Sequence, residues 1–290
     1  MLEWLQNTWT ALYGNISHVV ISSFPWVNLM VIILAGCLGT LLCGKLRAAV
    51  KDALLRALGL LIALMGASQL WNNFFVLQTG QFEATGTFLV VISLLIGYAL
   101  GRALSLDLAL GRLGTWLFGR FVKESTERKL AVARAVSQGL PIPEAKPSTL
   151  PSAEGFMLAT MTVAFGSPTI RGTLDCQMTE DALPMLVTLG FHAVVFFMLT
   201  ALFSSNAVFA AIPVLAVEGL LLLANNLWGN LLTHTLVNQF CLIGAVILIA
   251  TGLWMGMGKR VRTAHLIPAY LIPVIYGLTM LLVNKLIEKA

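Results

Sequence analysis

Apolar residues follow one another in eight long runs along this chain, separated by short polar or charged segments. A helix that crosses the roughly 30 Å hydrocarbon core of a bilayer needs about 20 apolar residues. The predicted membrane spans are 26–43, 53–71, 87–106, 155–170, 182–203, 207–227, 232–255 and 264–286. The fourth run is short and interrupted, so the main alternative has seven spans, with 155–170 as a half helix or re-entrant segment.

Composition agrees with this pattern. Hydrophobic residues make up 58% of the chain and charged residues 11%, and the mean hydropathy is +0.87. Water-soluble domains do not have this balance, so we predict an all-α polytopic membrane protein in contact with a lipid bilayer. The net charge of +5 does not indicate nucleic-acid binding, because the basic residues gather between the apolar runs.

The positions of the basic residues predict an orientation. All 18 Lys and Arg residues except Arg171, Lys285 and Lys289 fall on one side of the eight-span arrangement. Because basic residues in short loops are retained in the cytoplasm, that side is predicted to be cytoplasmic and both termini to lie outside. The acidic loop with Asp175, Glu180 and Asp181 is then also outside.

The chain divides into five predicted regions. Residues 1–25 have the spacing of an amphipathic interfacial helix, and 26–106 form a first membrane half of three helices. Residues 107–152 are predicted to form a cytoplasmic basic helix and a proline-rich linker. A central helix pair spans 153–203, with a break at 166–172, and a second half of three helices spans 204–287.

An internal similarity suggests a symmetric arrangement of the two halves. Residues 58–66 in the second span resemble 243–252 in the seventh, and these two spans are predicted to run in opposite directions. Inverted three-helix repeats flanking a broken central pair are a recurring plan of secondary transporters. Two alternatives remain: 27–45 also resembles 237–259, which runs the same way, and packed membrane helices share small-residue spacing in general.

Two ionisable residues lie near the middle of predicted spans. Glu218 is the acid in an otherwise apolar run, and His192 lies in the fifth span. An ionised carboxylate in the lipid core costs on the order of 3 kcal/mol or more, so Glu218 must be neutral, paired or in a polar cavity. Glu218 could couple a proton to transport, with His192 as a relay. The structural alternative is that both only bond neighbouring helices.

The predicted break offers further polar groups for a transport path. Ser167, Thr169, Arg171 and Asp175 lie at or just beyond it, and Pro168 removes a backbone donor. Exposed helix ends there could bind a small ion, although an ordinary turn at the end of a span explains the same residues.

Two asparagines complete the predicted path. Asn28 and Asn238 lie near the outer ends of the first and seventh spans. Side-chain amides at such positions also serve simply as helix caps, which is the structural alternative.

No catalytic or metal-binding motif is present. The sequence has no HExxH, GxSxG or P-loop pattern, and its four cysteines have no CxxC spacing. We therefore expect no enzymatic activity, no cofactor and no metal site.

Several short motifs resemble a known family. They are Val27-Asn28 with Gly36, Gly39 and Gly44, then residues 57–60, 211–215 with Glu218-Gly219, 259–262 and 266–269. Together they resemble the bacterial integral-membrane "domain of unknown function 554" family, the YdfK/YqgA-like group, over most of 27–277. The resemblance implies a helical membrane architecture and a bacterial inner-membrane location, and it implies little about chemistry.

Two functions from different classes fit these features. The first is a secondary transporter or permease for a small solute, coupled to protons through Glu218. The second is a non-transporting sensor, scaffold or assembly protein that acts through the cytoplasmic loop at 112–146. The sequence leaves the solute open and also allows a homo-oligomer.

Overall fold

The computed structural model describes residues 23–43, 45–74, 84–121, 153–179, 183–227 and 233–287, and every described element is a helix. The elements are α2 (Phe24–Cys43), α3 (Ala48–Phe74), α4 (Ala84–Ala103), α5 (Leu106–Phe121), α7 (Ala153–Ala159), η1 (Thr160–Ala164), α8 (Ser167–Thr179), α9 (Leu183–Phe203), η2 (Ser204–Ala210), α10 (Ala211–Leu227), α11 (His234–Met257), η3 (Thr263–Tyr270) and α12 (Leu271–Ile287). The all-α prediction is confirmed. The predicted helix at 1–25 and the linker that follows α5 lie almost entirely outside the described residues.

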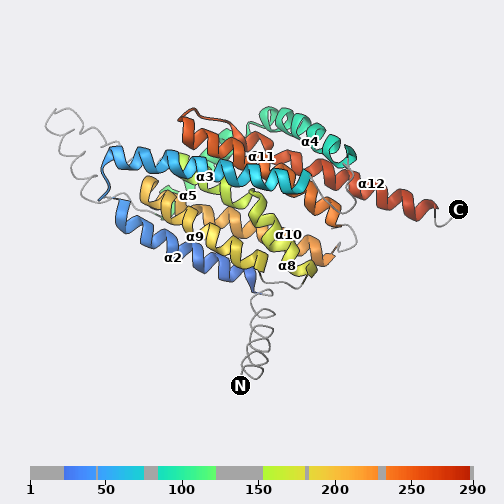
Figure 1. The fold of residues 1–290 in the computed structure, drawn as a ribbon, viewed down its shortest axis with the longest axis horizontal. Coiled ribbons are helices and arrows are strands. Elements are labelled where there is room, and N and C mark those ends of the chain that lie inside the picture. The colour runs from blue at the N-terminus through green and yellow to red at the C-terminus, as the bar shows by residue number, and fades with distance from the viewer. Residues whose placement is uncertain are drawn as a thin grey trace, which may run out of the picture.

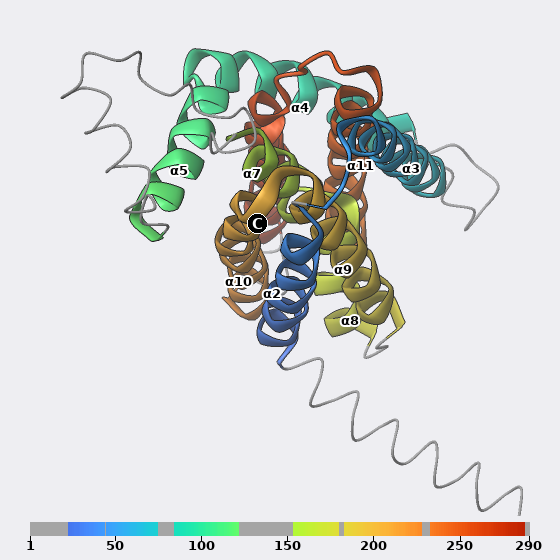
Figure 2. The same ribbon diagram turned by 90° about the vertical axis from the view of Figure 1, so that its left-hand side faces the viewer.

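Six described helices are long and apolar enough to cross a membrane: α2, α3, α9, η2 with α10, α11, and η3 with α12. A seventh crossing is obtained if Phe88–Ala103 and Leu106–Gly119, which meet at 60°, form one bent span. The bend lies at Ser105, whose φ of 52° is in the left-handed region, and α5 turns away from α4 there (Figure 2). The predicted total of eight is therefore slightly too high by this criterion, because 155–170 does not form one continuous helix.

Helices α3 and α11 form the most extensive helix pair and lie side by side along much of their length (Figure 1). A Cβ on Gly59 would lie 2.6 Å from the Gly252 carbonyl oxygen, and one on Gly66 would lie 2.8 Å from that of Ala245. Small residues thus let the two backbones touch, as is common between membrane helices. The order of these contacts shows that α3 and α11 run antiparallel.

Two other pairs of helices also pack closely. Along α2 and α9, Gly36 and Gly39 both pack against Thr200, whereas Asn28 meets His192 nearer the start of both helices, so this pair runs parallel. Helix α4 packs against η3, with Gly97 against Ala269 and Gly101 against His265, and these two run antiparallel. The relative directions of these helices agree with the alternation predicted from the apolar runs.

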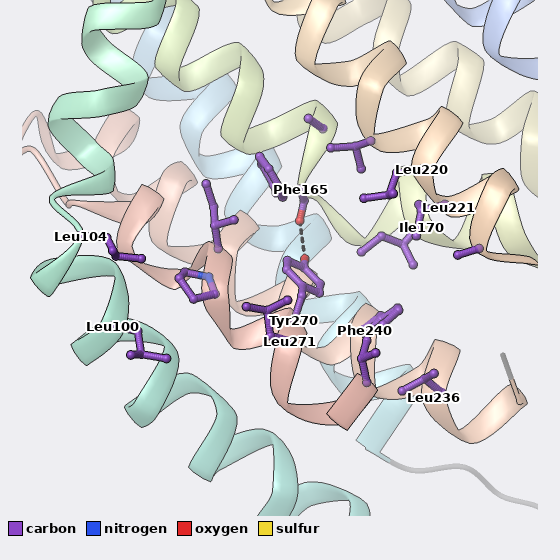
Figure 3. Close-up of a pocket in the computed structure, with 16 residues that line it drawn as sticks. Leu100, Leu104, Phe165, Ile170, Leu220, Leu221, Leu236, Phe240, Tyr270 and Leu271 are labelled. Carbon is purple, nitrogen blue, oxygen red and sulfur yellow. Dashed lines mark hydrogen bonds between the residues drawn. The ribbon is translucent and has the colours of Figure 1, made fainter. Parts of the chain in front are cut away.

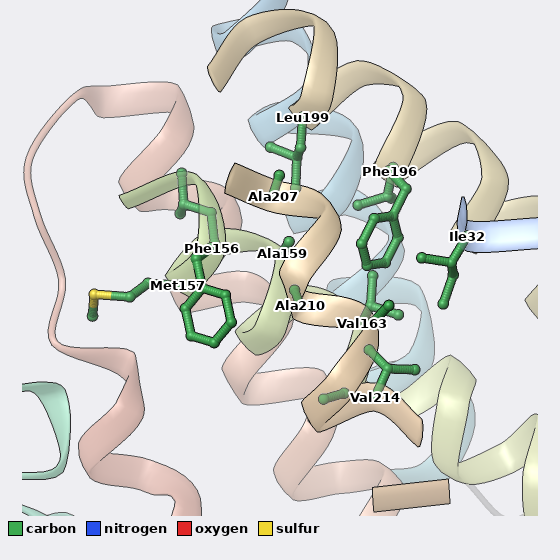
Figure 4. Close-up of a cluster of buried hydrophobic side chains, with 14 of the residues drawn as sticks. Ile32, Phe156, Met157, Ala159, Val163, Phe196, Leu199, Ala207, Ala210 and Val214 are labelled. Atoms are coloured by element: carbon green, nitrogen blue, oxygen red, sulfur yellow. The ribbon is translucent and has the colours of Figure 1, made fainter. Parts of the chain in front are cut away.

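The interrupted segment α7–η1–α8 lies inside this arrangement. Its side chains from Gly155 to Ala164 are all buried, in a core shared with α2, α9, η2 and α10 (Figure 4). Phe156, Ala159 and Val163 there pack among residues of those four elements. Because protein surrounds the segment, it does not need the unbroken helix that lipid exposure would demand.

Candidate functional site

The central helix breaks at two residues, Phe165 and Gly166. Upstream, η1 is a π-helix that ends at Phe165 with φ −108° and ψ 5°, and downstream α8 begins at Ser167. The break is thus narrower than the predicted 166–172. Pro168 lies in the first turn of α8, where its missing N–H costs nothing.

Tight packing holds the break in place. A Cβ on Gly166 would lie 2.1 Å from the Thr162 carbonyl oxygen, so that position has no room for a larger residue. Gly244 of α11 brings its own backbone against the other side, where an added Cβ would lie 2.6 Å from the Ser167 nitrogen. The break is therefore clamped between its own upstream turn and α11.

Side chains from α8 and η3 bind two carbonyls in and just before the break. The Thr169 hydroxyl donates to the Val163 carbonyl oxygen. The Tyr270 hydroxyl donates to the Phe165 carbonyl oxygen over 2.7 Å, as the dashed line in Figure 3 shows. These bonds satisfy backbone groups that a helix interruption leaves without an intrahelical partner.

Four side chains from four helices form a continuous hydrogen-bonded network. The Asn28 amide nitrogen (α2) donates to Glu218 Oε1 (α10), and His192 Nδ1 (α9) lies 2.8 Å from Asn28 Oδ1. On the other side of the ring, His192 Nε2 lies 2.9 Å from the Thr169 hydroxyl oxygen (α8). Through Thr169 the network reaches Val163 and the break. We call Glu218, Asn28, His192 and Thr169 the polar network.

All four members of the polar network have no exposed surface in this conformation. Asn28, His192 and Glu218 lie on helices long and apolar enough to cross a membrane, where an ionisable group pairs with others or marks a path for ions or protons. The polar network contains two such groups, Glu218 and His192, joined through one amide. It can therefore hold and redistribute a proton without contact with water.

Several buried oxygens in the interrupted segment and the polar network are unbonded. The hydroxyls of Thr160, Thr162 and Ser167, and Glu218 Oε2 in the polar network, have no hydrogen-bond partner among the described residues. Buried polar atoms are normally bonded, so each unbonded group marks a place where a water, ion or solute could bind.

Other buried hydroxyls in the same molecule behave differently. Thr173, Thr200 and Thr251 each donate to the carbonyl four residues earlier, which is the usual arrangement in a helix. Of the four buried hydroxyls without a partner among the described residues, three, Thr160, Thr162 and Ser167, lie in or next to the interrupted segment, and the fourth is Thr263.

The structure unites some of the predicted site residues and separates others. Glu218, His192, Thr169 and Asn28 form the polar network, and Ser167 lies buried at the break. Arg171 instead bonds Asn73 of α3 over 2.8 Å, away from the network. Asn238 is half-buried on α11 and makes no hydrogen bond to the network. Asp175 belongs to α8, and its side chain lies outside the described residues.

Sequence reasoning missed Tyr270, Thr160 and Thr162 as site residues. Tyr270 lies at the end of η3 in an apolar run, and nothing in that run indicates a carbonyl partner 105 positions away. The two threonines are found only once η1 is known to be a π-helix, because an ordinary helix would bond both hydroxyls. In the described part of the chain, no group of three or more His, Cys, Asp or Glu side chains could hold a metal ion.

A buried polar network at a broken helix within a bundle of apolar helices defines a multi-pass helical membrane protein with an intramembrane polar site. The chain belongs to the family described as "Protein of unknown function (DUF554)", whose family model matches residues 24–278. This confirms the resemblance found in the sequence. The "Uncharacterized membrane protein YdfK" of Bacillus subtilis (strain 168) is 20% identical over 246 residues, which cover 85% of this chain and 91% of that protein. No solved structure matches.

Proposed function

We propose that this protein is a secondary transporter of the bacterial inner membrane, with both termini outside, that moves a small polar solute together with a proton. The observation that carries the proposal is the polar network, which connects two ionisable side chains to the break in the central helix. Transporters commonly place solute and ion sites at discontinuous helices near the bilayer midplane.

The polar network is fully bonded when Glu218 carries a proton. Glu218 then donates to the Asn28 carbonyl oxygen, and the Asn28 amide donates to His192 Nδ1, after a half-turn of the amide that exchanges its oxygen and nitrogen. His192 donates from Nε2 to Thr169, which donates to the Val163 carbonyl. Every member has one partner on each side, and the network carries no net charge.

Loss of that proton changes the bond at the break. An ionised Glu218 accepts from the Asn28 amide nitrogen, so the Asn28 oxygen must accept from His192 Nδ1–H. His192 Nε2 is then an acceptor, and it competes with the Val163 carbonyl for the single Thr169 hydroxyl proton. Deprotonation thus weakens the Thr169–Val163 bond, one of the two bonds at the break. A break that this loosens and that opens to one side is the proposed coupling step.

The unbonded oxygens supply a binding site for the solute. Glu218 Oε2 and the hydroxyls of Thr160, Thr162 and Ser167 are all buried and have no partner among the described residues. Hydroxyls both donate and accept, and the acid accepts when ionised. This set suits a small solute that donates hydrogen bonds, such as an amine, an alcohol or a hydrated cation.

The packing of α3 against α11 supports an inverted repeat. In the sequence similarity between 58–66 and 243–252, Gly59 corresponds to Gly244, and Gly66 corresponds to Gly252 if the second segment has one extra residue. A two-fold axis between antiparallel helices then requires that the Gly59–Gly252 contact have a counterpart between Gly66 and residue 244 or 245. Gly66 does pack on Ala245. Rocking of two such halves would alternate access to the break.

The proposal is tested by proton flux in liposomes that contain the purified protein and an internal pH dye, challenged with a panel of small ions and metabolites. Wild type should give a solute-dependent proton signal. Glu218→Gln should abolish it while the protein stays folded, because glutamine reproduces the bonding of the protonated acid.

Glu154→Gln is the matched control, because Glu154 is exposed at the start of α7 and its loss should leave the signal intact. A flat response from folded wild-type protein would contradict transport and favour a sensor or scaffold. Deletion of 128–147 should then abolish the biological function, whereas a transporter should keep its flux after that deletion.

A further inference from the structure

An apolar groove of about 480 Å³ borders the break at Ala164 and Phe165. Its wall is formed by α4, the end of η1, the start of α8, and α10, α11, η3 and α12. Figure 3 shows side chains of these elements converging on Tyr270 and Phe165. The volume is within the range of sites that hold small organic ligands, about 300–1,000 Å³.

The groove opens onto the outer surface of the helix bundle. At its mouth, Leu104, Leu220 and Leu271 are 65%, 64% and 58% exposed. At its base, Ile170 and Phe240 are only 3% and 5% exposed. Leu220 and Leu271 lie on helices long and apolar enough to cross a membrane, and Leu104 lies at the bend between α4 and α5, so the groove continues the surface that such helices present to lipid chains.

The lining offers an occupant no hydrogen bond. Fifteen of the 16 lining residues have apolar side chains, and the exception is Tyr270. Its hydroxyl is already engaged with the Phe165 carbonyl over 2.7 Å. Water is a poor occupant because it needs about two to four polar partners. An occupant made of hydrocarbon fits this lining.

We propose that this groove binds one acyl chain of a membrane lipid, which enters from the bilayer at the mouth and ends against the break. The surrounding bilayer supplies such chains, and the mouth faces it directly. The chain would touch Ala164 and Ile170 on either side of the break and Val217 next to Glu218. A bound acyl chain would thereby pack against Tyr270 and Phe165, whose hydrogen bond it would shield, and it would restrict movement of the break. This inference does not depend on transport.

The test uses purified full-length protein in vesicles of phosphatidylglycerol and phosphatidylethanolamine that contain a trace lipid with a photoreactive group at the end of one acyl chain. After illumination, labelled peptides are quantified by mass spectrometry. Labelling of groove residues should exceed, several-fold, the labelling of the open face of α3 at Leu60, Leu61 and Leu64, which are also highly exposed.

Variants then separate a specific site from general lipid contact. Ala224 lines the groove, and Ala224→Phe should fill it and lower groove labelling several-fold. Ala216→Phe is the control, because Ala216 is exposed on the same helix and lies outside the lining. If Ala224→Phe does not fold, judged by size-exclusion chromatography and thermal unfolding, Leu221→Trp serves the same purpose.

Three results would overturn the proposal. The first is groove labelling equal to that of the α3 face, and the second is groove labelling that stays unchanged in the folded filling variant. The third is a dimer by size-exclusion chromatography that Ala224→Phe dissociates, which would make the groove a contact between protomers. A flat proton signal in the liposome assay would leave the lipid site untouched, so the two proposals fail separately.

Discussion

Two carbonyls on either side of Ala164 meet different surroundings. Val163 bonds Thr169, whose hydroxyl also faces His192 and so belongs to a network with ionisable groups. Phe165 bonds Tyr270, which lines an apolar groove and makes no hydrogen bond to the polar network. Both side chains solve the same problem, a backbone acceptor that the interrupted helix leaves unbonded.

The difference lies in what each hydroxyl can do next. The Thr169 proton has two acceptors within reach, so its position depends on the protonation of the network. The Tyr270 hydroxyl is not joined to the network, so its bond to Phe165 does not depend on that protonation. Under the proposed function, the break therefore has one bond that a proton can switch and one that is fixed.

The largest expected effect comes from removing the centre of the polar network. Asn28→Leu leaves Glu218 and His192 without their partner inside the bundle, which should lower the free energy of unfolding by about 2–4 kcal/mol. Thermal unfolding in detergent measures the change. Asn238→Leu is the control, because Asn238 is half-buried outside the network, and an equal loss there would show that the network is not special.

A smaller loss of stability is expected when a side chain is added where α11 contacts the break. In Gly244→Ala the new Cβ would lie 2.6 Å from the Ser167 nitrogen, so one backbone must shift, at a cost of about 1–3 kcal/mol. Gly219→Ala is the matched control, since a Cβ there meets no atom within 4 Å. If both variants unfold at the same temperature as wild type, the break is not clamped as described.

The smallest effect separates the two carbonyls. Tyr270→Phe and Thr169→Val each remove one hydrogen bond and should each cost about 1 kcal/mol in the free energy of unfolding. Only Thr169→Val should also change how proton flux varies with pH, because only Thr169 is joined to His192. Identical pH profiles for the two variants would remove the distinction between a switchable and a fixed bond.

Much of the helical arrangement could be predicted from the sequence, because apolar runs report membrane spans directly. The run 182–203 matches α9, Leu183–Phe203, within one residue. The fourth span was harder, because its apolar content predicts a helix while Gly166 and Pro168 predict an interruption. The structure has both a helix and an interruption: a π-helix ends before the break, and a new helix begins at Ser167.

Each member of the polar network could be proposed as a site residue from the sequence, but the hydrogen bonds that join the members could not. Glu218 and His192 are conspicuous because ionisable groups are rare in apolar runs. Asn28 and Glu218 are 190 positions apart, and only the packing of α2 beside α10 brings them together. Arg171 shows the opposite case, because its position near the break suggested a role in the path and the fold directs it to Asn73.

The most direct test of the account follows the two carbonyls separately. Solid-state NMR of the protein in lipid bilayers, with ¹³C carbonyl labels at Val163 and Phe165 assigned through single-site variants, would report each hydrogen bond as pH is raised. We predict that the Val163 resonance shifts in wild type and stays fixed in Glu218→Gln, while the Phe165 resonance shifts in neither. A Val163 resonance that does not respond to pH in wild type, or one that moves together with Phe165, would contradict proton control of the break.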